Sequence, residues 1–301
     1  MFAARQTPVF AFMVGVLGIA LFSGMDAVMK GLVLAIGTIA TVFWRNLIGV
    51  GLSGALYLPR RKNWPSGPTM RIHIARGVLS TAMAILFFWG LGRVPLAQAI
   101  AFAFIAPLIA LYLASLILKE TIGQKTVAAS LLAFAGVVVI LIGQARADLG
   151  REALIGSLAI LISAVLYALN IILMRRQALV ADPLEITFFQ SAIVTVTMLF
   201  FAIPFVGLSV PPFGQWPFLV AAASLAVASM LLLSWAYARA EASYLAATEY
   251  TSFLWAVLFG WLFFDEIVSP FTLAGAVLIV AGCIMAARRP EEASPALEAA
   301  T

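Results

Sequence analysis

Three charged side chains interrupt long apolar runs of the sequence: Asp26, Arg45 and Glu249. A charge inside a lipid bilayer costs about 2.5–3.5 kcal/mol even on scales from insertion experiments, so such a residue faces a partner or a water-filled cavity. Arg45 is suited to a carboxylate, either that of a neighbouring helix or that of a substrate. Glu249 has no basic residue three or four positions away. It is suited to holding a proton or recognising an amino or cationic group, or it is a neutral acid bonded to a neighbouring helix.

Asp26 has two possible partners. It lies four residues before Lys30, which is the spacing of an ion pair along one helix face. It is also the carboxylate nearest in depth to Arg45 if the first two apolar runs form a hairpin. We therefore expect Asp26 and Lys30 to form an ion pair or a gate near one membrane surface.

Uncharged polar and aromatic residues inside the apolar runs are further candidates for a cavity. They are Gln98, Asn170, Gln190, Trp89, Tyr167, Trp235, Tyr244 and Tyr250. The amides could equally form hydrogen bonds between helices, and the aromatic rings could face lipid. Pro107, midway along its apolar run, removes a backbone hydrogen bond and predicts a kink or hinge.

The elements that must position these residues are membrane helices. Hydrophobic residues make up 64% of the 301 residues and charged residues 10%, whereas soluble domains are about half apolar and a quarter charged. Ten runs are long enough to span a bilayer. They are 8–30, 34–58, 72–92, 95–118, 125–143, 153–174, 185–207, 217–238, 243–264 and 269–287.

Basic residues set the expected orientation. Thirteen Lys and Arg residues fall in the loops and helix ends of one side and four on the other, which places both termini in the cytoplasm of a bacterial inner-membrane protein. The net charge of +5 therefore reflects membrane orientation and not nucleic-acid binding. The tail, 291–301, is expected to be disordered.

An internal repeat divides the chain. A shift of 146 places 79–136 over 225–282 without a gap and aligns Trp89 with Trp235 and Glu120 with Glu266. Five helices in each half make the two repeats, 1–146 and 147–290, inverted relative to each other around a central cavity. Trp89 and Trp235 then lie near opposite mouths of that cavity, where we expect them to gate it.

Two apparent enzyme signals have simpler interpretations. The sequence 49–54 reads Gly-Val-Gly-Leu-Ser-Gly, but it lies inside an apolar run and indicates close helix packing rather than a dinucleotide site. His73 is the only histidine and is expected at a cytoplasmic helix start, with no set of residues for metal or nucleophilic catalysis around it. We predict that the protein is not an enzyme and needs no cofactor.

The chain resembles the drug/metabolite transporter superfamily, in the ten-helix branch with two EamA-type repeats. The resemblance covers 8–288 and rests on the five-plus-five plan, on Trp44-Arg45, and on the paired segments Leu118-Lys-Glu120 and Phe264-Asp-Glu266. Gln190 departs from it, because an arginine is frequent at that position. The resemblance implies alternating access around a cavity lined by the third, fourth, eighth and ninth helices, and it is greatest to bacterial exporters of aromatic amino acids and methyl viologen.

These observations predict an all-α integral membrane exporter of amino acids, neutral or aromatic ones, whose partners are a small substrate and the lipid bilayer. The alternative is a proton-coupled exporter of lipophilic cations that uses Glu249 as the counter-charge. A membrane enzyme or scaffold would need a catalytic cluster or a large soluble surface, and the sequence offers neither.

Overall fold

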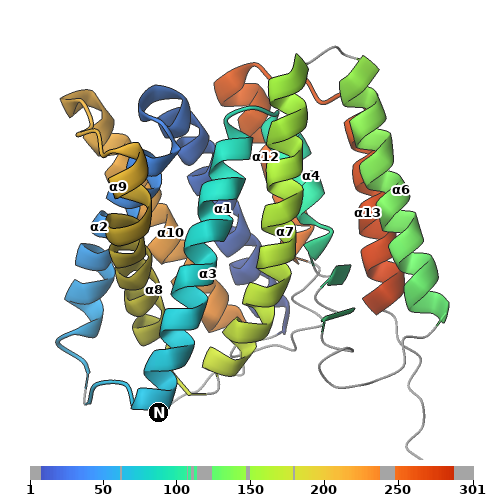
Figure 1. The fold of residues 1–301 in the computed structure, drawn as a ribbon. Coiled ribbons are helices and arrows are strands. Elements are labelled where there is room, and N and C mark those ends of the chain that lie inside the picture. Colours follow the sequence, from blue (N-terminus) through green and yellow to red (C-terminus); the bar gives the residue numbers. More distant parts are fainter. Residues whose placement is uncertain are drawn as a thin grey trace, which may run out of the picture.

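A computed structural model describes residues 8–61, 63–106, 108–109, 112–113, 124–146, 150–178, 180–237 and 248–287. The α-helices are α1 (Pro8–Ile36), α2 (Thr38–Tyr57), α3 (Gly67–Leu91), α4 (Leu96–Ala103), α6 (Gln124–Arg146), α7 (Gly150–Ala178), α8 (Pro183–Thr197), α9 (Ile203–Val206), α10 (Trp216–Tyr237), α12 (Thr251–Phe264) and α13 (Pro270–Ala287) (Figure 1). A π-helical segment, Met198–Ala202, joins α8 to α9.

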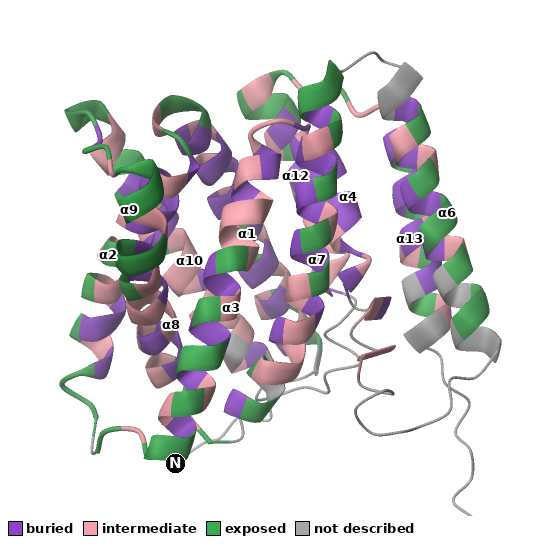
Figure 2. Cartoon of the chain, viewed as in Figure 1, coloured by how far each residue is buried: buried purple, intermediate pink, exposed green. Residues whose placement is uncertain are grey.

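The helices have the lengths and surfaces of membrane spans. Six are long and apolar enough to cross a bilayer, and three described segments are shorter apolar helices. Figure 2 shows exposed residues along α6, the π-helical segment and α9. The exposed side chains there are apolar, as at Phe201 (72% exposed) and Leu131 (66% exposed). Such a surface is stable only in lipid, so the protein is an all-α integral membrane protein; the count of ten spans stays a prediction.

Helix starts follow the sequence signals. Ser66 caps α3 by accepting a hydrogen bond from the Thr69 N–H, and Asp182 caps α8 by accepting from two backbone N–H groups. Pro183 and Pro270 are the first residues of α8 and α13. A proline is tolerated there because its missing N–H would have no helical partner. These two helices therefore begin where a proline costs no hydrogen bond.

Helix packing repeats itself between the two halves of the chain. By order along the chain, α1, α2, α3 and α6 correspond to α7, α8, α10 and α13. The contact of α1 with α10 has its counterpart in that of α3 with α7, and the contact of α2 with α10 has its counterpart in that of α8 with α3. The pairs α2–α8 and α6–α13 map onto themselves. This is the packing expected of two similar halves related by a two-fold axis.

Glycines allow several of these helices to approach closely. A Cβ at Gly49 would lie 3.1 Å from Ser191 Oγ, and one at Gly54 would lie 3.2 Å from Phe188. The Gly-Val-Gly-Leu-Ser-Gly segment therefore packs α2 against α8, which confirms the interpretation as a helix-packing motif. A Cβ at Gly51, in contrast, would have no neighbouring atom within 4 Å.

The helix connections gather at two ends of the bundle, the Gly37 end and the Ser66 end. The Gly37 end carries the one-residue turn between α1 and α2, at Gly37, together with the α3–α4 and α12–α13 connections. The Ser66 end carries the start of α3 and the α7–α8 connection.

Candidate transport site

Asp26 and Arg45 form the first part of the site. Asp26 on α1 is 2% exposed, and Arg45 on α2 is half-buried. The Arg45 guanidinium donates to Met25 Sδ at 3.8 Å and to Asn46 Oδ1 at 3.3 Å. The charges of Asp26 and Arg45 interact, yet the side chains form no ion pair within 4.0 Å in the described part of the chain. An acidic and a basic side chain on neighbouring helices are therefore held without direct contact.

Five buried polar side-chain atoms lack a hydrogen-bond partner among the described residues. They are Ser23 Oγ, Arg45 Nε, Gln190 Oε1, Ser229 Oγ and Trp255 Nε1. They come from α1, α2, α8, α10 and α12; α1 contacts α2, α10 and α12, and α8 contacts α2 and α10. An unsatisfied buried polar atom costs about 1–3 kcal/mol. Such atoms are candidates for contact with a ligand or an ordered water.

Lys30 does not pair with Asp26, so the predicted ion pair within α1 is wrong. Lys30 forms its ion pair with Glu266, in the connection between α12 and α13, and donates to Val94 O at 2.7 Å. The other carboxylate oxygen of Glu266 accepts from the Leu96 N–H at 2.7 Å. Lys30 is 4% exposed, and α1 continues to Ile36 instead of ending at the predicted position 30.

A second polar network lies toward the Ser66 end. Arg76 on α3 donates to Asn170 Oδ1 at 3.0 Å and to Gln177 Oε1, both on α7. Gln177 also bonds to His73, and His73 Nε2 lies 3.0 Å from Glu185 Oε1 on α8. His73 and Arg76 are 1% and 4% exposed. The sequence placed His73 at a cytoplasmic helix start; the structure adds that both side chains are buried between helices.

The spacing of these residues carried a signal that was missed. His73 and Arg76 are three residues apart and Asn170 and Gln177 are seven apart, so each pair lies on one helix face. Two polar faces at helical spacing predict a contact between them.

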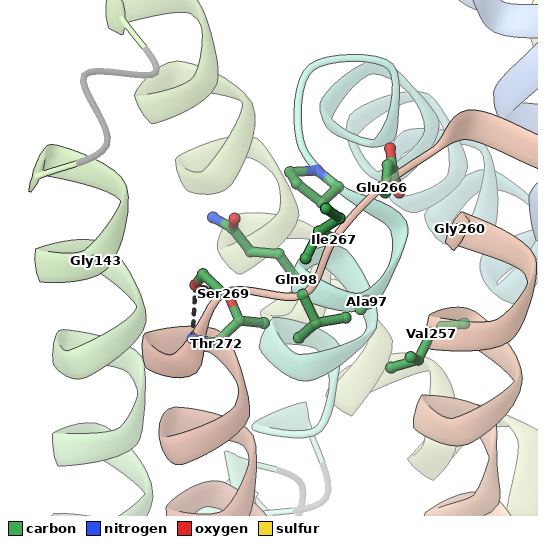
Figure 3. A pocket seen from close by; sticks show the side chains of 12 residues that line it. Ala97, Gln98, Gly143, Val257, Gly260, Glu266, Ile267, Ser269 and Thr272 are labelled. Carbon is green, nitrogen blue, oxygen red and sulfur yellow. Dashed lines mark hydrogen bonds between the residues drawn. The ribbon is translucent and has the colours of Figure 1, made fainter.

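Gln98 lines a small pocket between α4, α12 and the α12–α13 connection, with a volume of about 170 Å³ (Figure 3). Its side chain is 3% exposed and donates to Ser157 Oγ on α7 at 3.4 Å. Gln98 thus has the helix-linking bond that was one of its two predicted roles. Glu266 lines the same pocket, so the pocket adjoins the Lys30 ion pair.

The two tryptophans of the repeat lie at opposite ends of the bundle. Trp89 lines a pocket of about 560 Å³ at the Gly37 end, where Arg93 stacks on its ring at 3.5 Å. Trp235 contacts the ring of Phe10 edge to face, near the start of α1. The placement agrees with the inverted repeat; the gating role stays a prediction.

Other predicted residues are spread through the bundle. Tyr167 is half-buried on α7 beside Arg76, and Glu249 is half-buried just before α12. Tyr250 contacts the ring of Phe104 at 5.7 Å. Tyr244 and Pro107 lie outside the described residues.

Comparison with known sequences decides the class of protein. The EamA-like transporter family matches the chain twice, over residues 9–142 and 154–288. The chain belongs to this family. It is therefore a membrane transporter and not an enzyme, and the resemblance to the drug/metabolite transporter superfamily is confirmed.

Relatives of this EamA-family transporter carry transport names. The chain is 27% identical over 272 residues to the pseudopaline exporter CntI of Pseudomonas aeruginosa, covering 89% of this chain and 92% of that protein. It is 29% identical over 217 residues to a riboflavin transporter of Rhizobium johnstonii, covering 72% and 70% of the two chains.

A solved structure shares the fold of this EamA-family transporter. A crystal structure with 22% sequence identity covers 94% of this chain and all of its own, with a TM-score of 0.62. Transporter relatives imply a small-molecule substrate and a membrane environment, so the buried polar residues are candidates for a transport site.

Proposed function

We propose that the protein exports amino acids, neutral or aromatic ones, from the cytoplasm by alternating access. The observation that carries the proposal is the separation of Asp26 and Arg45. A free amino acid has an ammonium and a carboxylate on one carbon. Arg45 is suited to the carboxylate and Asp26 to the ammonium, so one zwitterion would neutralise both protein charges.

The surrounding atoms suit the same ligand. Arg45 Nε is a buried donor and Gln190 Oε1 a buried acceptor, both without a partner in the described part of the chain. The Trp255 and Phe259 rings stack 6.1 Å apart on α12, and Phe259 lies 3.7 Å from the Cβ position of Gly24. Gly24 is two residues from Asp26, so an apolar or aromatic side chain would have rings to pack against.

The relatives support transport of a small molecule, and one of them supports export. One is named as an exporter and another as a riboflavin transporter. The proposed repeats, 1–146 and 147–290, would rock about the Asp26–Arg45 region, with ten helices and both termini in the cytoplasm of an inner membrane. In this orientation the Ser66 end faces the cytoplasm.

Transport by purified protein in liposomes tests the proposal. A panel of labelled amino acids and a methyl viologen-like cation should show flux of at least one amino acid. Asp26→Asn and Arg45→Gln should each lower that flux about 10- to 100-fold, because each removes a charge-assisted hydrogen bond worth about 1.5–3 kcal/mol. Arg71→Gln is the matched control, since Arg71 is exposed on α3.

Two results would reject the proposal. One is cation flux without flux of any amino acid, which would favour the alternative that uses Glu249. The other is amino-acid flux that Asp26→Asn and Arg45→Gln lower no more than Arg71→Gln does.

A further inference from the structure

His73 and Glu185 form a buried acid–base pair that the proposed substrate site does not use. The His73 side chain is 0% exposed, and its Nε2 lies 3.0 Å from Glu185 Oε1. The ring stacks on Phe189, with centroids 4.8 Å apart. Histidine changes charge between about pH 5 and 8, so a buried histidine beside a carboxylate is a potential proton site.

Two residues determine which ring nitrogen of His73 carries the proton: Arg76 orients Gln177, and Gln177 bonds to His73. Arg76 has only N–H donors, so the atom of Gln177 that faces it must be the carbonyl oxygen. The Gln177 amide nitrogen must then face His73 Nδ1. An amide nitrogen only donates, so Nδ1 must accept and carries no proton.

The consequence is a single defined tautomer. Neutral His73 carries its proton on Nε2 and donates it to Glu185. A second proton on Nδ1 would place two donors face to face. Relief requires the Gln177 amide to rotate, which turns its nitrogen toward Arg76 and removes the acceptor of the Arg76 Nη1 group. Protonation of His73 and the Arg76–Gln177 hydrogen bond therefore exclude each other.

Other charged groups near the pair are few among the described residues. From α2, the Tyr57 hydroxyl donates to Glu185 Oε2 at 3.3 Å, and Arg61 interacts with Tyr57. From α8, Asp182 interacts with Tyr57. From α7, Arg176 is exposed. Arg76 on α3 is thus the one positive charge bonded into the network, and it acts on His73 through Gln177.

We propose that the His73–Glu185 pair is a proton-binding site and that Gln177 transmits its state to Arg76. The arriving proton binds Nδ1 and makes His73 an imidazolium paired with Glu185. Gln177 then rotates, and Arg76 keeps Asn170 but loses Gln177. One N–H group of Arg76, beside Asn170 and Tyr167, then lacks its former acceptor.

The single histidine makes the proton site directly observable. Full-length protein with a histidine-free tag is labelled with isotope-enriched histidine, reconstituted in nanodiscs, and followed by nitrogen NMR between about pH 5 and 8. The expected spectrum at the alkaline end is one neutral ring with the proton on Nε2, and it converts to the doubly protonated ring on acidification. A ring protonated on Nδ1 alone, or no change across the range, would overturn the proposal.

Two substitutions test the role of Gln177. Gln177→Glu supplies oxygen acceptors to both Arg76 and His73, so the ring should stay doubly protonated at the alkaline end. Arg76→Gln removes the group that orients Gln177, so the neutral ring should become a mixture of both tautomers.

The control separates this effect from charge alone. Arg71→Gln removes an exposed positive charge from the same helix and should leave a single tautomer, with its midpoint within about half a pH unit of the unmodified protein. If Arg76→Gln gives the same tautomer as Arg71→Gln, and Gln177→Glu leaves the ring neutral, Gln177 does not control His73. These readouts need no substrate, so they stand or fall separately from amino-acid export.

Discussion

The two ends of the bundle hold their buried charges in different ways. At the Gly37 end, Lys30 and Glu266 meet directly, and backbone groups at Val94 and Leu96 satisfy their remaining hydrogen bonds. Toward the Ser66 end, Gln177 and His73 lie between the charged groups of Arg76 and Glu185. A direct ion pair has two states, formed or broken, whereas a chain of amide and imidazole groups can be rearranged by one proton.

The Lys30–Glu266 pair and the Arg76 network each join different helices. The Lys30–Glu266 pair connects α1 in the first half with the α12–α13 connection in the second. The Arg76 network connects α3 with α7 and α8. Both join the two halves of the chain, so movement of one half against the other must strain or break them. The Gly37 end should therefore open at a larger free-energy cost than the Ser66 end.

The largest expected effect comes from breaking the Lys30–Glu266 pair. Lys30→Met should lower the free energy of unfolding by about 3–5 kcal/mol, because it leaves a partly buried carboxylate without its cation. Unfolding in detergent, followed by denaturant titration, measures this loss. The double variant with Glu266→Gln should lose less than the sum of the single losses. Additive losses would mean that the two charges do not stabilise each other.

A smaller loss of folding free energy is expected when Glu185, the acceptor of the His73 network, is removed. Glu185→Ala takes away the acceptor of both His73 and Tyr57 and should lower the free energy of unfolding by about 1.5–3 kcal/mol. Glu185→Gln keeps an oxygen acceptor at the same place and is the matched variant, with a smaller loss. A loss for Glu185→Ala as large as that for Lys30→Met would contradict the difference between the two ends.

The sequence predicted what is local or repeated. Glycine packing by 49–54 and the all-α class follow from spacing and composition, and the family from a resemblance; the structure and comparisons confirm them. The opposite placement of Trp89 and Trp235 followed from the repeat. The substrate and the roles of the site residues stay predictions.

Partner choice could not be predicted in the same way. Lys30 and Glu266 are 236 residues apart, and Asp26, four residues away, offered a local partner that the fold does not use. Which carboxylate a lysine meets depends on how the helices pack, and helical spacing does not contain that information. The burial of Arg76 was not predicted, because basic residues near apolar runs usually belong to loops, although its spacing from His73 was informative.

Glycine substitutions test how rigid the two ends are. A Cβ at Gly90, near the Gly37 end, would lie 2.5 Å from the backbone oxygen of Gly156, which cannot move without shifting α7. A Cβ at Gly77 would meet the side chain of Ile193. Both alanine variants should lower the free energy of unfolding by about 1–3 kcal/mol, with the larger loss at Gly90. Thermal melting in detergent should show this order, and Gly51→Ala, with open space, should show no loss. A larger loss at Gly77 would reverse the predicted rigidity.

The smallest effect is expected for a second ion pair at the Gly37 end. Arg93 donates to Glu152 at 3.0 Å, but the Glu152 side chain is 73% exposed, whereas Glu266 is 18% exposed. Water and salt screen an exposed pair, so Glu152→Gln should change the free energy of unfolding by only about 0–1 kcal/mol. Raising the salt concentration should remove that difference while leaving the loss from Lys30→Met nearly unchanged. Equal salt sensitivity of the two variants would show that Lys30 and Glu266 are solvated, and the contrast between the two ends would then not depend on burial.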